Sequence, residues 1–453
     1  MSELPQSWQE CKLEDITQDV IYGYTAKASV APADSKMLRI TDIQDNKVNW
    51  HTVPYCTISK KDKNKYQLKI GDLVFARTGA TVGKSFLITD EVPDSVFASY
   101  LIRVRCTYHQ NINYLNYFFK SPYYWNQITE FSVGTGQPNV NGSKLKNLIV
   151  PLAPINEQQR IANRLDTLLT AVDTCRARLD KLPALIKRFR QSVLAVATSG
   201  NLTEEQGKNT WQKINVGALL LDIRYGTAKK CFYEPQETPV IRIPNICNGL
   251  ISKIDLKYAT FDEKERQKLS LVAGDILIIR SNGSVDLVGR TALVSKADEG
   301  FLYAGYLIRL RANHQMVNPA YLAIALSAPN VRNIIELTAR STSGVNNINT
   351  EEIKALVIEL PAIAEQIEIV RRVEALFAIA DKLEASLATA RKRVDQLTPS
   401  ILAQAFRGEL VAQDPSDEPA SALLARITGI AADVVAALPV LPALSKSALK
   451  KAA

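Results

Sequence analysis

Three short motifs contain residue types that could bind phosphate, a methyl donor or a catalytic metal ion. Gly79–Ser85 reads GATVGKS, one residue short of the G-x-x-x-x-G-K-[ST] loop that holds nucleotide phosphates. Ser121–Tyr124 reads SPYY, which lacks the second proline of the amino-methyltransferase loop, and no glycine-rich cofactor fingerprint precedes it. Pro93-Asp94 could begin a nuclease motif, but no Glu-x-Lys follows. We therefore predict that the chain has no ATP site, no bound cofactor and no catalytic site.

Basic and hydroxyl side chains recur instead at equivalent places in two halves of the chain. Arg77 and Arg280 each follow a hydrophobic run and open a glycine-containing loop, which Lys84 and Arg290 close. Guanidinium and ammonium groups on loops suit DNA phosphates, and arginine can also bridge O6 and N7 of guanine. The predicted DNA-binding residues are Tyr22, Lys27, Arg77, Thr78, Lys84, Tyr225, Lys229, Lys230, Arg280, Ser281 and Arg290.

Structural roles compete with DNA contact at some of these positions. Arg77 and Arg280 could cap a sheet or form salt bridges with it. Two asparagine-rich turns, 137–141 and 346–349, could hydrogen-bond adenine, but each also precedes a helical pattern. For Asn141 and Asn349 we favour a role as helix N-cap.

The order of these motifs follows from a direct repeat that covers most of the chain. Trp8 and Trp211 are 203 residues apart, and the same offset carries GDLVFAR, beginning at Gly71, onto GDILIIR, beginning at Gly274. After a short insertion YLIRVR meets YLIRLR, and SVLAVATSGNL meets SILAQAFRGEL. Two copies indicate a pseudo-symmetric molecule rather than a solenoid, which needs three or more repeats.

Each copy divides into a sheet-based globule and a long helix. Short apolar runs bounded by Gly, Asn, Asp and Pro predict strands, and helical stretches follow near 114–131 and 320–337. The fold class is therefore mixed α/β, with two similar sheet-based domains.

Apolar residues then recur in alternating steps of four and three, a period of 3.5 that predicts a coiled-coil seam. The seam of the first copy is Ile161, Leu165, Leu168, Val172, Cys175, Leu179, Leu182, Ile186, Phe189, Val193 and Val196. The seam of the second copy is Ile369, Val373, Leu376, Ala380, Leu383, Leu387, Ala390, Val394, Leu397 and Ile401. We predict that the two helices pair within the chain, antiparallel about a pseudo-two-fold axis, and that Pro183 and Pro399 bend or interrupt them. A helix packed inside a larger core is the alternative.

Composition narrows the functional class. The chain has 453 residues, 46% hydrophobic, and a net charge of +9, which favours a polyanionic partner. The six cysteines contain no C-x-x-C pair and the three histidines are isolated, so we predict no metal site. No apolar run is long enough to span a membrane, and the N-terminus lacks a signal-peptide pattern. We expect a cytoplasmic protein with no membrane partner.

Several motifs resemble those of the specificity subunits of type I restriction-modification systems. LPQSWQECKLEDI resembles the opening of these subunits, and TGQPNVN followed by LKNLIVPLAPINEQ resembles their junction of recognition domain and helix. ILAQAFRGELVAQDPSDEPASALLARI is similar to their distal helix and tail. The second junction, VIELPAIAEQ, departs from the first in its proline placement, which leaves its loop path open. The resemblance covers residues 1–430.

This resemblance implies a non-catalytic DNA-binding subunit. It divides the chain into a first target recognition domain (1–155), a central helix (156–200), a second recognition domain (201–362), a distal helix (363–410) and a tail (411–453). Its implied partners are double-stranded DNA, two modification (methyltransferase) subunits and restriction subunits. S-adenosylmethionine, ATP and magnesium would be bound by those partners. Each domain would read one half of a bipartite site, with the coiled coil setting the spacing. The alternatives are a self-contained DNA methyltransferase and a protein-interaction scaffold.

For the tail, the sequence predicts a short helix capped by Ser416 or Asp417, followed by a loosely ordered alanine-rich end.

Overall fold

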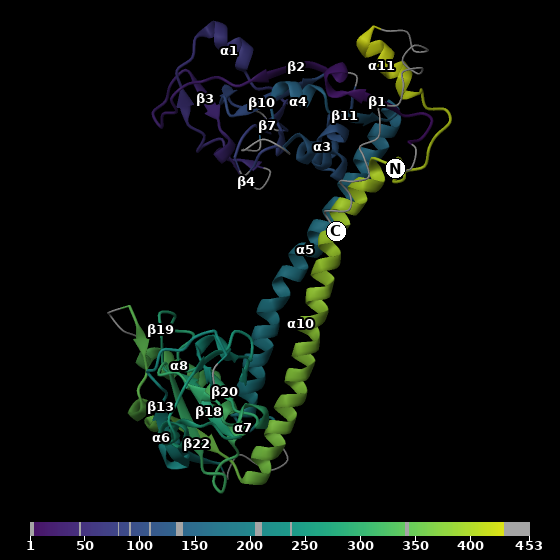
Figure 1. The fold of residues 1–453 in the computed structure, drawn as a ribbon. Coiled ribbons are helices and arrows are strands. Elements are labelled where there is room, and N and C mark those ends of the chain that lie inside the picture. Colours follow the sequence, from purple (N-terminus) through teal and green to yellow (C-terminus); the bar gives the residue numbers. More distant parts are fainter. Residues whose placement is uncertain are drawn as a thin grey trace. The chain divides into compact units, whose positions relative to one another are not determined.

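The chain folds into two compact units, and one of them is discontinuous in sequence. The computed structural model describes residues 4–44, 47–79, 81–89, 92–107, 110–132, 139–203, 211–235, 238–339 and 344–429. The first unit combines residues 1–178 with 390–453, and the second is residues 179–389 (Figure 1). Two long helices, α5 (Ile155–Ala197) and α10 (Ile363–Ala405), each contribute one part to each unit.

The first unit consists of small sheets with short helices. Its described elements are β1 (Gln9–Lys12), β2 (Thr17–Tyr22), β3 (Ser35–Leu38), β4 (Ile43–Gln44), β5 (Lys47–Val48), β6 (Tyr55–Cys56), α1 (Lys60–Tyr66), β7 (Leu73–Ala76), β8 (Ser85–Leu87), β9 (Ser95–Phe97), β10 (Leu101–Cys106), α2 (Ile112–Phe118), α3 (Pro122–Ser132), α4 (Gly142–Lys146), β11 (Ile149–Leu152) and α11 (Ala420–Thr428). The antiparallel sheet has the order β2-β10-β7-β8, a mixed sheet has the order β6-β3-β9, and β1 pairs with β11.

The second unit repeats this topology. Its described elements are β12 (Gln212–Asn215), β13 (Leu220–Tyr225), β14 (Thr238–Ile241), β15 (Ile246–Cys247), β16 (Leu250–Ile251), β17 (Lys257–Ala259), α6 (Glu263–Leu269), β18 (Asp275–Ile279), β19 (Ser281–Asn282), β20 (Thr291–Leu293), β21 (Leu302–Tyr303), β22 (Leu307–Ala312), α7 (Pro319–Ser327), α8 (Pro329–Ala339), β23 (Asn346–Asn347), α9 (Thr350–Ala355) and β24 (Val357–Leu360). The sheets have the orders β13-β22-β18-β20 and β17-β14-β21, and β12 pairs with β24. The predicted duplication and mixed α/β class are confirmed.

The central strand of each main sheet carries a buried arginine. Arg103 in β10 and Arg309 in β22 are 2% and 3% exposed at their side chains. Both oxygens of Asp19 accept hydrogen bonds from Arg103 Nη2 at 3.1 and 2.9 Å, and Asp222 accepts one from Arg309 Nη2. A buried charge is tolerated only when it is paired, so these ion pairs fix the register of the first strand against the central one.

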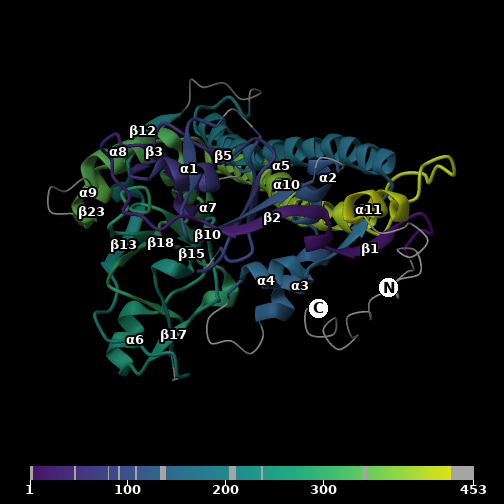
Figure 2. The ribbon, with the colours of Figure 1, turned by 90° about the horizontal axis from the view of Figure 1, so that it is seen from above.

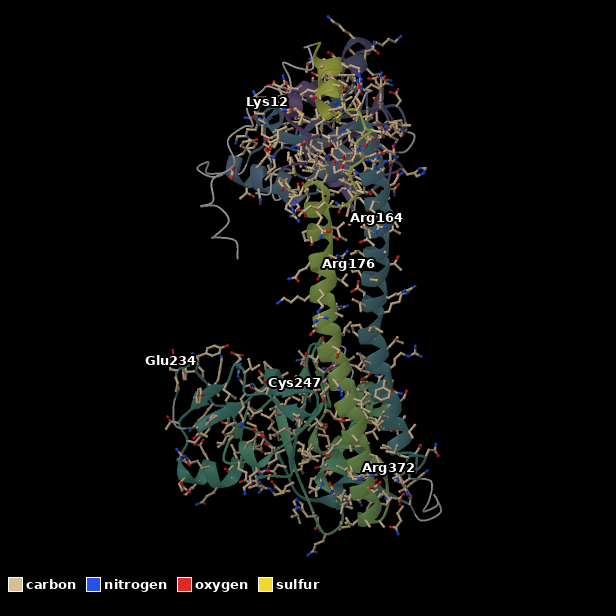
Figure 3. The ribbon with its side chains drawn as sticks, turned by 90° about the vertical axis from the view of Figure 1, so that its right-hand side faces the viewer. Lys12, Arg164, Arg176, Glu234, Cys247 and Arg372 are labelled. Atoms are coloured by element: carbon tan, nitrogen blue, oxygen red, sulfur yellow. The ribbon has the colours of Figure 1, made fainter. Side chains whose placement is uncertain are left out.

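α5 and α10 are antiparallel within each unit, as predicted (Figures 1 and 2). In the first unit Arg176 Nε, labelled in Figure 3, lies 3.3 Å from Asp395 Oδ1, and Leu165 shares a core with Leu402. Residue numbers thus rise along one helix as they fall along the other. In the second unit the same rule holds, because Ile186 packs with Leu387 whereas Val193 belongs to the core that contains Val373.

Only alternate positions of the predicted seam are buried in the middle of the helices. In the second unit Ile186 of α5 is 7% exposed, but Leu182 is 38% and Phe189 37% exposed. On α10 Leu387 is 8% exposed and Leu383 is 52% exposed. In a two-stranded coiled coil both apolar rows face the partner helix. Here one row packs between the helices and the other stays accessible.

The two prolines do not interrupt the helices. Pro183 lies inside α5 and Pro399 inside α10, and each helix is continuous over 43 residues. Proline removes a single backbone donor, and packing along both sides of the position keeps the remaining turns helical. Of the two predicted outcomes, a bend or an interruption, the interruption was wrong.

A segment after α10 closes the first unit. Arg160 Nη2 donates to Asp417 Oδ2 at 2.6 Å, and Gln413 Nε2 donates to Glu157 Oε1 at 2.6 Å. The backbone N–H of Ala420 donates to the carbonyl of Ser7 at 2.9 Å. We call residues 406–428 the clasp, because they join α5 to the start of the chain.

The prediction that Ser416 or Asp417 caps the tail helix was wrong. α11 begins at Ala420 after Pro419, with no side-chain cap. Asp417 is engaged by Arg160 instead, and the Ser416 hydroxyl bonds to Asp414. Long-range ion pairing thus competed with local capping and prevailed. The remainder of the predicted tail, 430–453, lies outside the described residues. No helix in the described ranges has the length and apolarity that crossing a membrane would require.

Candidate nucleic-acid interface

An arginine stacks on a tyrosine at the same place in both units. The Arg77 guanidinium carbon lies 5.0 Å from the centre of the Tyr22 ring, and that of Arg280 lies 4.6 Å from the centre of the Tyr225 ring. Arg77 directly follows the buried strand β7, and Arg280 directly follows the buried strand β18. Each of these strands lies next to an edge strand of its sheet. Cation–π contact restricts the orientation of each guanidinium plane.

The two tyrosines are in turn fixed by helix starts. The Tyr22 hydroxyl accepts a hydrogen bond from the Gly142 N–H at 2.8 Å, and the Tyr225 hydroxyl accepts one from the Thr350 N–H at 3.2 Å. These residues are the first of α4 and α9, whose N–H groups lack intrahelical partners. In the described part of the chain neither stacked arginine has a carboxylate within salt-bridge distance.

The asparagines that precede α4 and α9 are N-caps, as favoured from the sequence. Asn141 Oδ1 accepts from the Lys144 N–H at 2.8 Å, and Asn349 Oδ1 accepts from the Glu352 N–H at 2.9 Å. The cap holds each helix start beneath the tyrosine hydroxyl. The part of the first asparagine-rich turn at 137–138 lies outside the described residues.

The two stacked arginines differ in one neighbour. Arg280 Nε donates to Asn347 Oδ1 at 3.1 Å, and Ser281 pairs with Asn347 in the β19–β23 ladder. In the first unit Thr78 forms the equivalent bridge with Asn139. Yet Arg77 Nε and Asn139 Oδ1 are both buried and have no hydrogen-bond partner among the described residues. The two units therefore hold equivalent side chains in different hydrogen-bonded states.

The glycine-containing loop after each arginine is a packing feature. Gly83 and Gly289 have φ of 81° and 79°, a region that favours glycine. A Cβ at either position would also collide with an isoleucine of the following helix pair, Ile128 or Ile335. The lysine of the P-loop-like motif, Lys84, is exposed next to this turn, and its carbonyl accepts from the Ala76 N–H at 2.9 Å.

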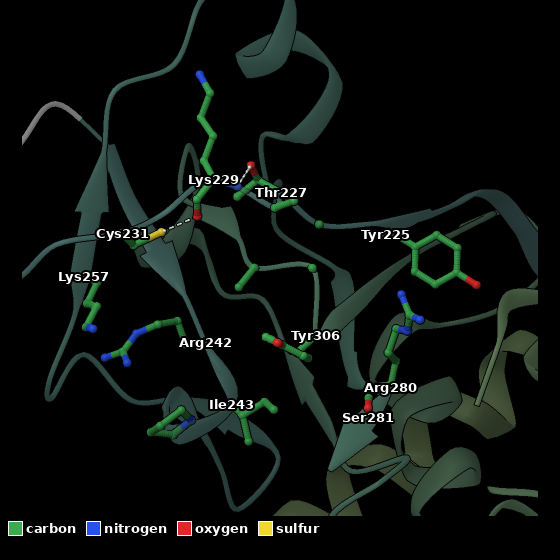
Figure 4. A pocket seen from close by; sticks show the side chains of 15 residues that line it. Tyr225, Thr227, Lys229, Cys231, Arg242, Ile243, Lys257, Arg280, Ser281 and Tyr306 are labelled. Atoms are coloured by element: carbon green, nitrogen blue, oxygen red, sulfur yellow. Dashed lines mark hydrogen bonds between the residues drawn. The ribbon is translucent and has the colours of Figure 1, made fainter. Parts of the chain in front are cut away.

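A cleft of about 660 Å³ opens beside Arg280 in the second unit (Figure 4). Its lining includes four basic residues and no acidic residue. The lining residues are Tyr225, Gly226, Thr227, Ala228, Lys229, Cys231, Arg242, Ile243, Pro244, Lys257, Arg280, Ser281, Ala304, Gly305 and Tyr306. Such a surface attracts an anionic ligand.

Of the six DNA-binding residues predicted in the second unit, four line this cleft, whereas Lys230 and Arg290 do not. Tyr225, Arg280 and Ser281 line it with their side chains in view (Figure 4). The Lys229 side chain points away, because its amine binds Glu265 Oε2 at 2.6 Å. Lys230 is exposed over the Phe232 ring, outside the lining.

The other predicted basic residues also lie outside the cleft. Arg290 pairs with Asp286 at 2.9 Å on the surface. Lys27 of the first unit is exposed, as is Lys84. An engaged amine or guanidinium must release its carboxylate before it binds phosphate, so Arg290 and Lys229 are weaker candidates than the sequence indicated.

Sequence reasoning missed three residues of the cleft, Arg242, Lys257 and Tyr306. A signal existed for two of them. Arg242 lies in IRIPNI, which repeats LRITDI, and Tyr306 opens YLIRLR, which repeats YLIRVR. Tyr306 is 64% exposed, and its carbonyl accepts from the Arg280 N–H at 2.9 Å. Lys257 gave no such signal, because the residue 203 positions earlier is Pro54.

Comparison with known proteins gives matches along most of the chain. The family model described as type I restriction modification DNA specificity domain matches residues 5–184 and again 209–389. The EcoKI specificity subunit of Escherichia coli K12 is 33% identical, and the StySPI specificity subunit of Salmonella potsdam is 34% identical. Each comparison covers 92% of both chains.

Solved structures share the fold. A chain from a study of complex assembly and conformational transition of the type I R-M system has a TM-score of 0.69 and 19% identity, covering 90% of this chain and 100% of its own. The HsdS subunit of Thermoanaerobacter tengcongensis has a TM-score of 0.61 and 18% identity, covering 90% and 98%.

Proposed function

Because this chain belongs to the type I restriction-modification DNA specificity family, we propose that each of its two units reads one half of a bipartite DNA site. The chain is the DNA-recognition component of a type I complex and is not itself an enzyme. The observation that carries the proposal is the arginine that directly follows a buried strand and stacks on a tyrosine, found at equivalent positions in the two units. The recognition domains would comprise residues 1–155 and 201–362.

In this proposal Arg77 and Arg280 contact base edges, and the exposed basic residues contact phosphates. A guanidinium held in one plane can make two hydrogen bonds to guanine, whereas a mobile ammonium group acts as a point charge. Thr78 and Ser281 would contact DNA beside the arginines, with Tyr22 and Tyr225 supporting them. Lys27, Lys84, Lys230, and more weakly Lys229 and Arg290, would bind the backbone. Because the two units differ in sequence and in the arginine's partner, their half-sites would differ.

The helices α5 and α10 would set the distance between the half-sites. They are long, antiparallel and common to both units. A helix is stiff over this length compared with a loop, so the spacing it imposes is defined.

The accessible seam, the apolar row that is not buried between α5 and α10, supports docking of helices from partner subunits. Leu182 and Phe189 on α5 and Leu383 on α10 are seam positions that stay accessible in the second unit, and Ile379 beside the seam is exposed as well. Additional helices would bury this row and complete a bundle. By pseudo-symmetry we propose two modification subunits in the complex, to which restriction subunits are added. S-adenosylmethionine, ATP and magnesium would be held by these partners.

One set of binding measurements tests this function. Duplexes selected from a random pool by the chain assembled with its modification subunits should share two separated, unlike sequence blocks. Filter binding of those duplexes should be specific and salt-sensitive, and the pure chain should transfer no methyl group from S-adenosylmethionine. A pool without any shared sequence would refute half-site reading. Methyl transfer by the pure chain would instead favour a self-contained methyltransferase.

A further inference from the structure

The cleft of the second unit has two chemically different ends (Figure 4). Arg280 and Tyr225 form one end, Arg242 and Lys257 form the other, and Tyr306 lies between them. Both ends are cationic, yet their side chains are held in different ways. That difference indicates what each end can bind.

At the Arg280 end, the planar guanidinium group is held in one orientation. Its Nε is occupied by Asn347 and its face by the Tyr225 ring. The terminal amino groups of Arg280 have no hydrogen-bond partner among the described residues and can bind a ligand, in a geometry that matches two acceptors on one base edge.

The other end presents two cations, of which Arg242 is paired with a carboxylate and Lys257 is not. Arg242 Nη2 donates to Asp255 Oδ2 at 2.9 Å and to the Asp255 carbonyl at 2.5 Å, so a phosphate would bind the other terminal amino group or compete with this carboxylate. The Lys257 amine lies 4.4 Å from the centre of the Tyr233 ring, which leaves its charge unpaired by that contact. Burial raises the pKa of the Cys231 thiol while both cations lower it, so Arg242 and Lys257 act on the same point in the cleft.

This end is particular to the second unit. The counterpart of Lys257 is Pro54, which carries no charge. The counterpart of Arg242 is Arg39, whose Nε and Nη2 both donate to Asp42, at 3.0 and 2.7 Å. The first unit therefore lacks the paired cations at the equivalent place.

We propose that Arg242 and Lys257 form a binding subsite for a DNA backbone phosphate, next to the base-reading Arg280. The inference rests on the proposed function and assigns phosphate binding to one end of the cleft and base contact to the other. A phosphate carries oxygen acceptors in several directions, which suits an ammonium group beside a guanidinium. Phosphate contact at one end would fix the register in which Arg280 meets its base.

The salt dependence of binding distinguishes the two ends. The full chain, assembled with its modification subunits, is titrated with its selected duplex between about 50 and 200 mM salt. Each phosphate contact contributes about 0.9 to the slope of log K against log salt, so Lys257→Gln and Arg242→Gln should each reduce the slope by about that amount. Both should weaken selected and altered half-sites by the same factor. Arg280→Lys keeps the charge and should instead lose discrimination at one base position.

Matched variants separate charge from structure. Lys257→Arg keeps the charge and should keep the slope. Lys213→Gln removes a charge from β12, outside the cleft, and should leave binding unchanged. Replacing the contacted phosphate by a neutral methylphosphonate should weaken wild type and leave Lys257→Gln unaffected.

An unchanged slope in Lys257→Gln and Arg242→Gln, in variants with wild-type thermal unfolding, would overturn the subsite. Loss confined to one base position would overturn it as well, because both residues would then read bases. If the wild-type complex shows no sequence preference at all, the proposed function fails instead, and that result is recognisable before any variant is made.

Discussion

Arg280 Nε donates to Asn347 Oδ1 at 3.1 Å, whereas Arg77 and Asn139, at the equivalent positions of the first unit, leave both atoms without a partner among the described residues. The hydrogen bond in the second unit fixes the two side chains relative to each other. In the first unit the same two atoms are buried and do not form this hydrogen bond. The two units are thus related by duplication but hold this arginine–asparagine pair in different hydrogen-bonded states.

Replacing Arg280 by alanine should cost about 1–3 kcal/mol on the selected site and relax one base position, because a bidentate contact is lost. Asn347→Ala should cost about 1 kcal/mol, roughly fivefold in affinity, at that same position. Competition binding with single-base variants of the duplex measures both effects. Arg77→Ala serves as the matched comparison and should relax a position in the other half-site. Equal losses on every sequence would show that Arg280 contacts only phosphate or supports the fold.

The stability of the second unit should depend on pH through Asp222. Burial raises the pKa of this carboxyl, but hydrogen bonds from Arg309 and Arg224 lower it by more, so the folded-state pKa lies below the ordinary value. A carboxyl with a depressed pKa stabilises the fold above its unfolded pKa, about 3.9, and loses that contribution as the pH falls. Thermal unfolding between about pH 7 and pH 3 should show the loss.

The control for this prediction is Asp222→Asn. At neutral pH it leaves Arg309 buried without its carboxylate and should cost about 3–5 kcal/mol. Because Asn does not titrate, this part of the acid dependence should disappear in the variant. A variant that retained the full wild-type pH profile would assign the dependence to other groups.

The sequence predicted the architecture well because duplication and heptads are periodic signals. The offset that joins Trp8 to Trp211 also joins Asp19 to Asp222 and orders the strands around them. Asn141 and Asn349 were identifiable as caps since capping is local. The role of Asp417 was not, because its partner Arg160 lies 257 residues away in the chain. Lys257 was missed for a related reason: a repeat reveals only what recurs, and its counterpart is Pro54.

Weakening the clasp should destabilise the first unit selectively. Leu423 of α11 is buried in the core that includes Trp8 and Phe406, so Leu423→Ala should cost about 2–5 kcal/mol. Hydrogen exchange should accelerate in the strands of the first unit and remain unchanged in those of the second. The matched change in the second unit is Leu322→Ala, a buried leucine of α7, which should give the reverse pattern. Uniform acceleration would mean that the two units unfold together.

Lengthening the helices should abolish binding to the original site. Seven residues inserted after Leu179 and seven after Leu387 keep the heptads in phase, and these leucines belong to one cluster near the middle of the two helices. The helices should lengthen by about 10 Å. If they lie along the DNA, that equals about 3 base pairs, but DNA also rotates by roughly a third of a turn over that distance. A longer DNA spacer should therefore restore binding only in part. Undiminished affinity for the original site, in a folded variant, would show that the helices do not measure the distance.

The accessible seam should govern assembly with the modification subunits. Phe189→Ser combined with Leu383→Gln removes two of its apolar side chains and should weaken the complex, because less apolar surface is buried on docking. Sedimentation of the mixed subunits measures the change. Gln191→Ala provides a control that should assemble normally, because Gln191 is exposed on α5 and helical geometry places it on roughly the opposite side from Phe189. Normal assembly of the double variant would place the partner elsewhere.

Because the first unit is discontinuous in sequence, its two parts leave the ribosome at different times, before and after the second unit. Its opening 178 residues emerge before the second unit, residues 179–389, which is a continuous segment. At about 5–20 residues per second, synthesis of that segment takes on the order of ten to forty seconds. Throughout this interval the surface around Trp8 lacks Phe406 and Leu423. The recognition unit made first is consequently completed last, and the nascent chain exposes an apolar surface to chaperones until α11 emerges.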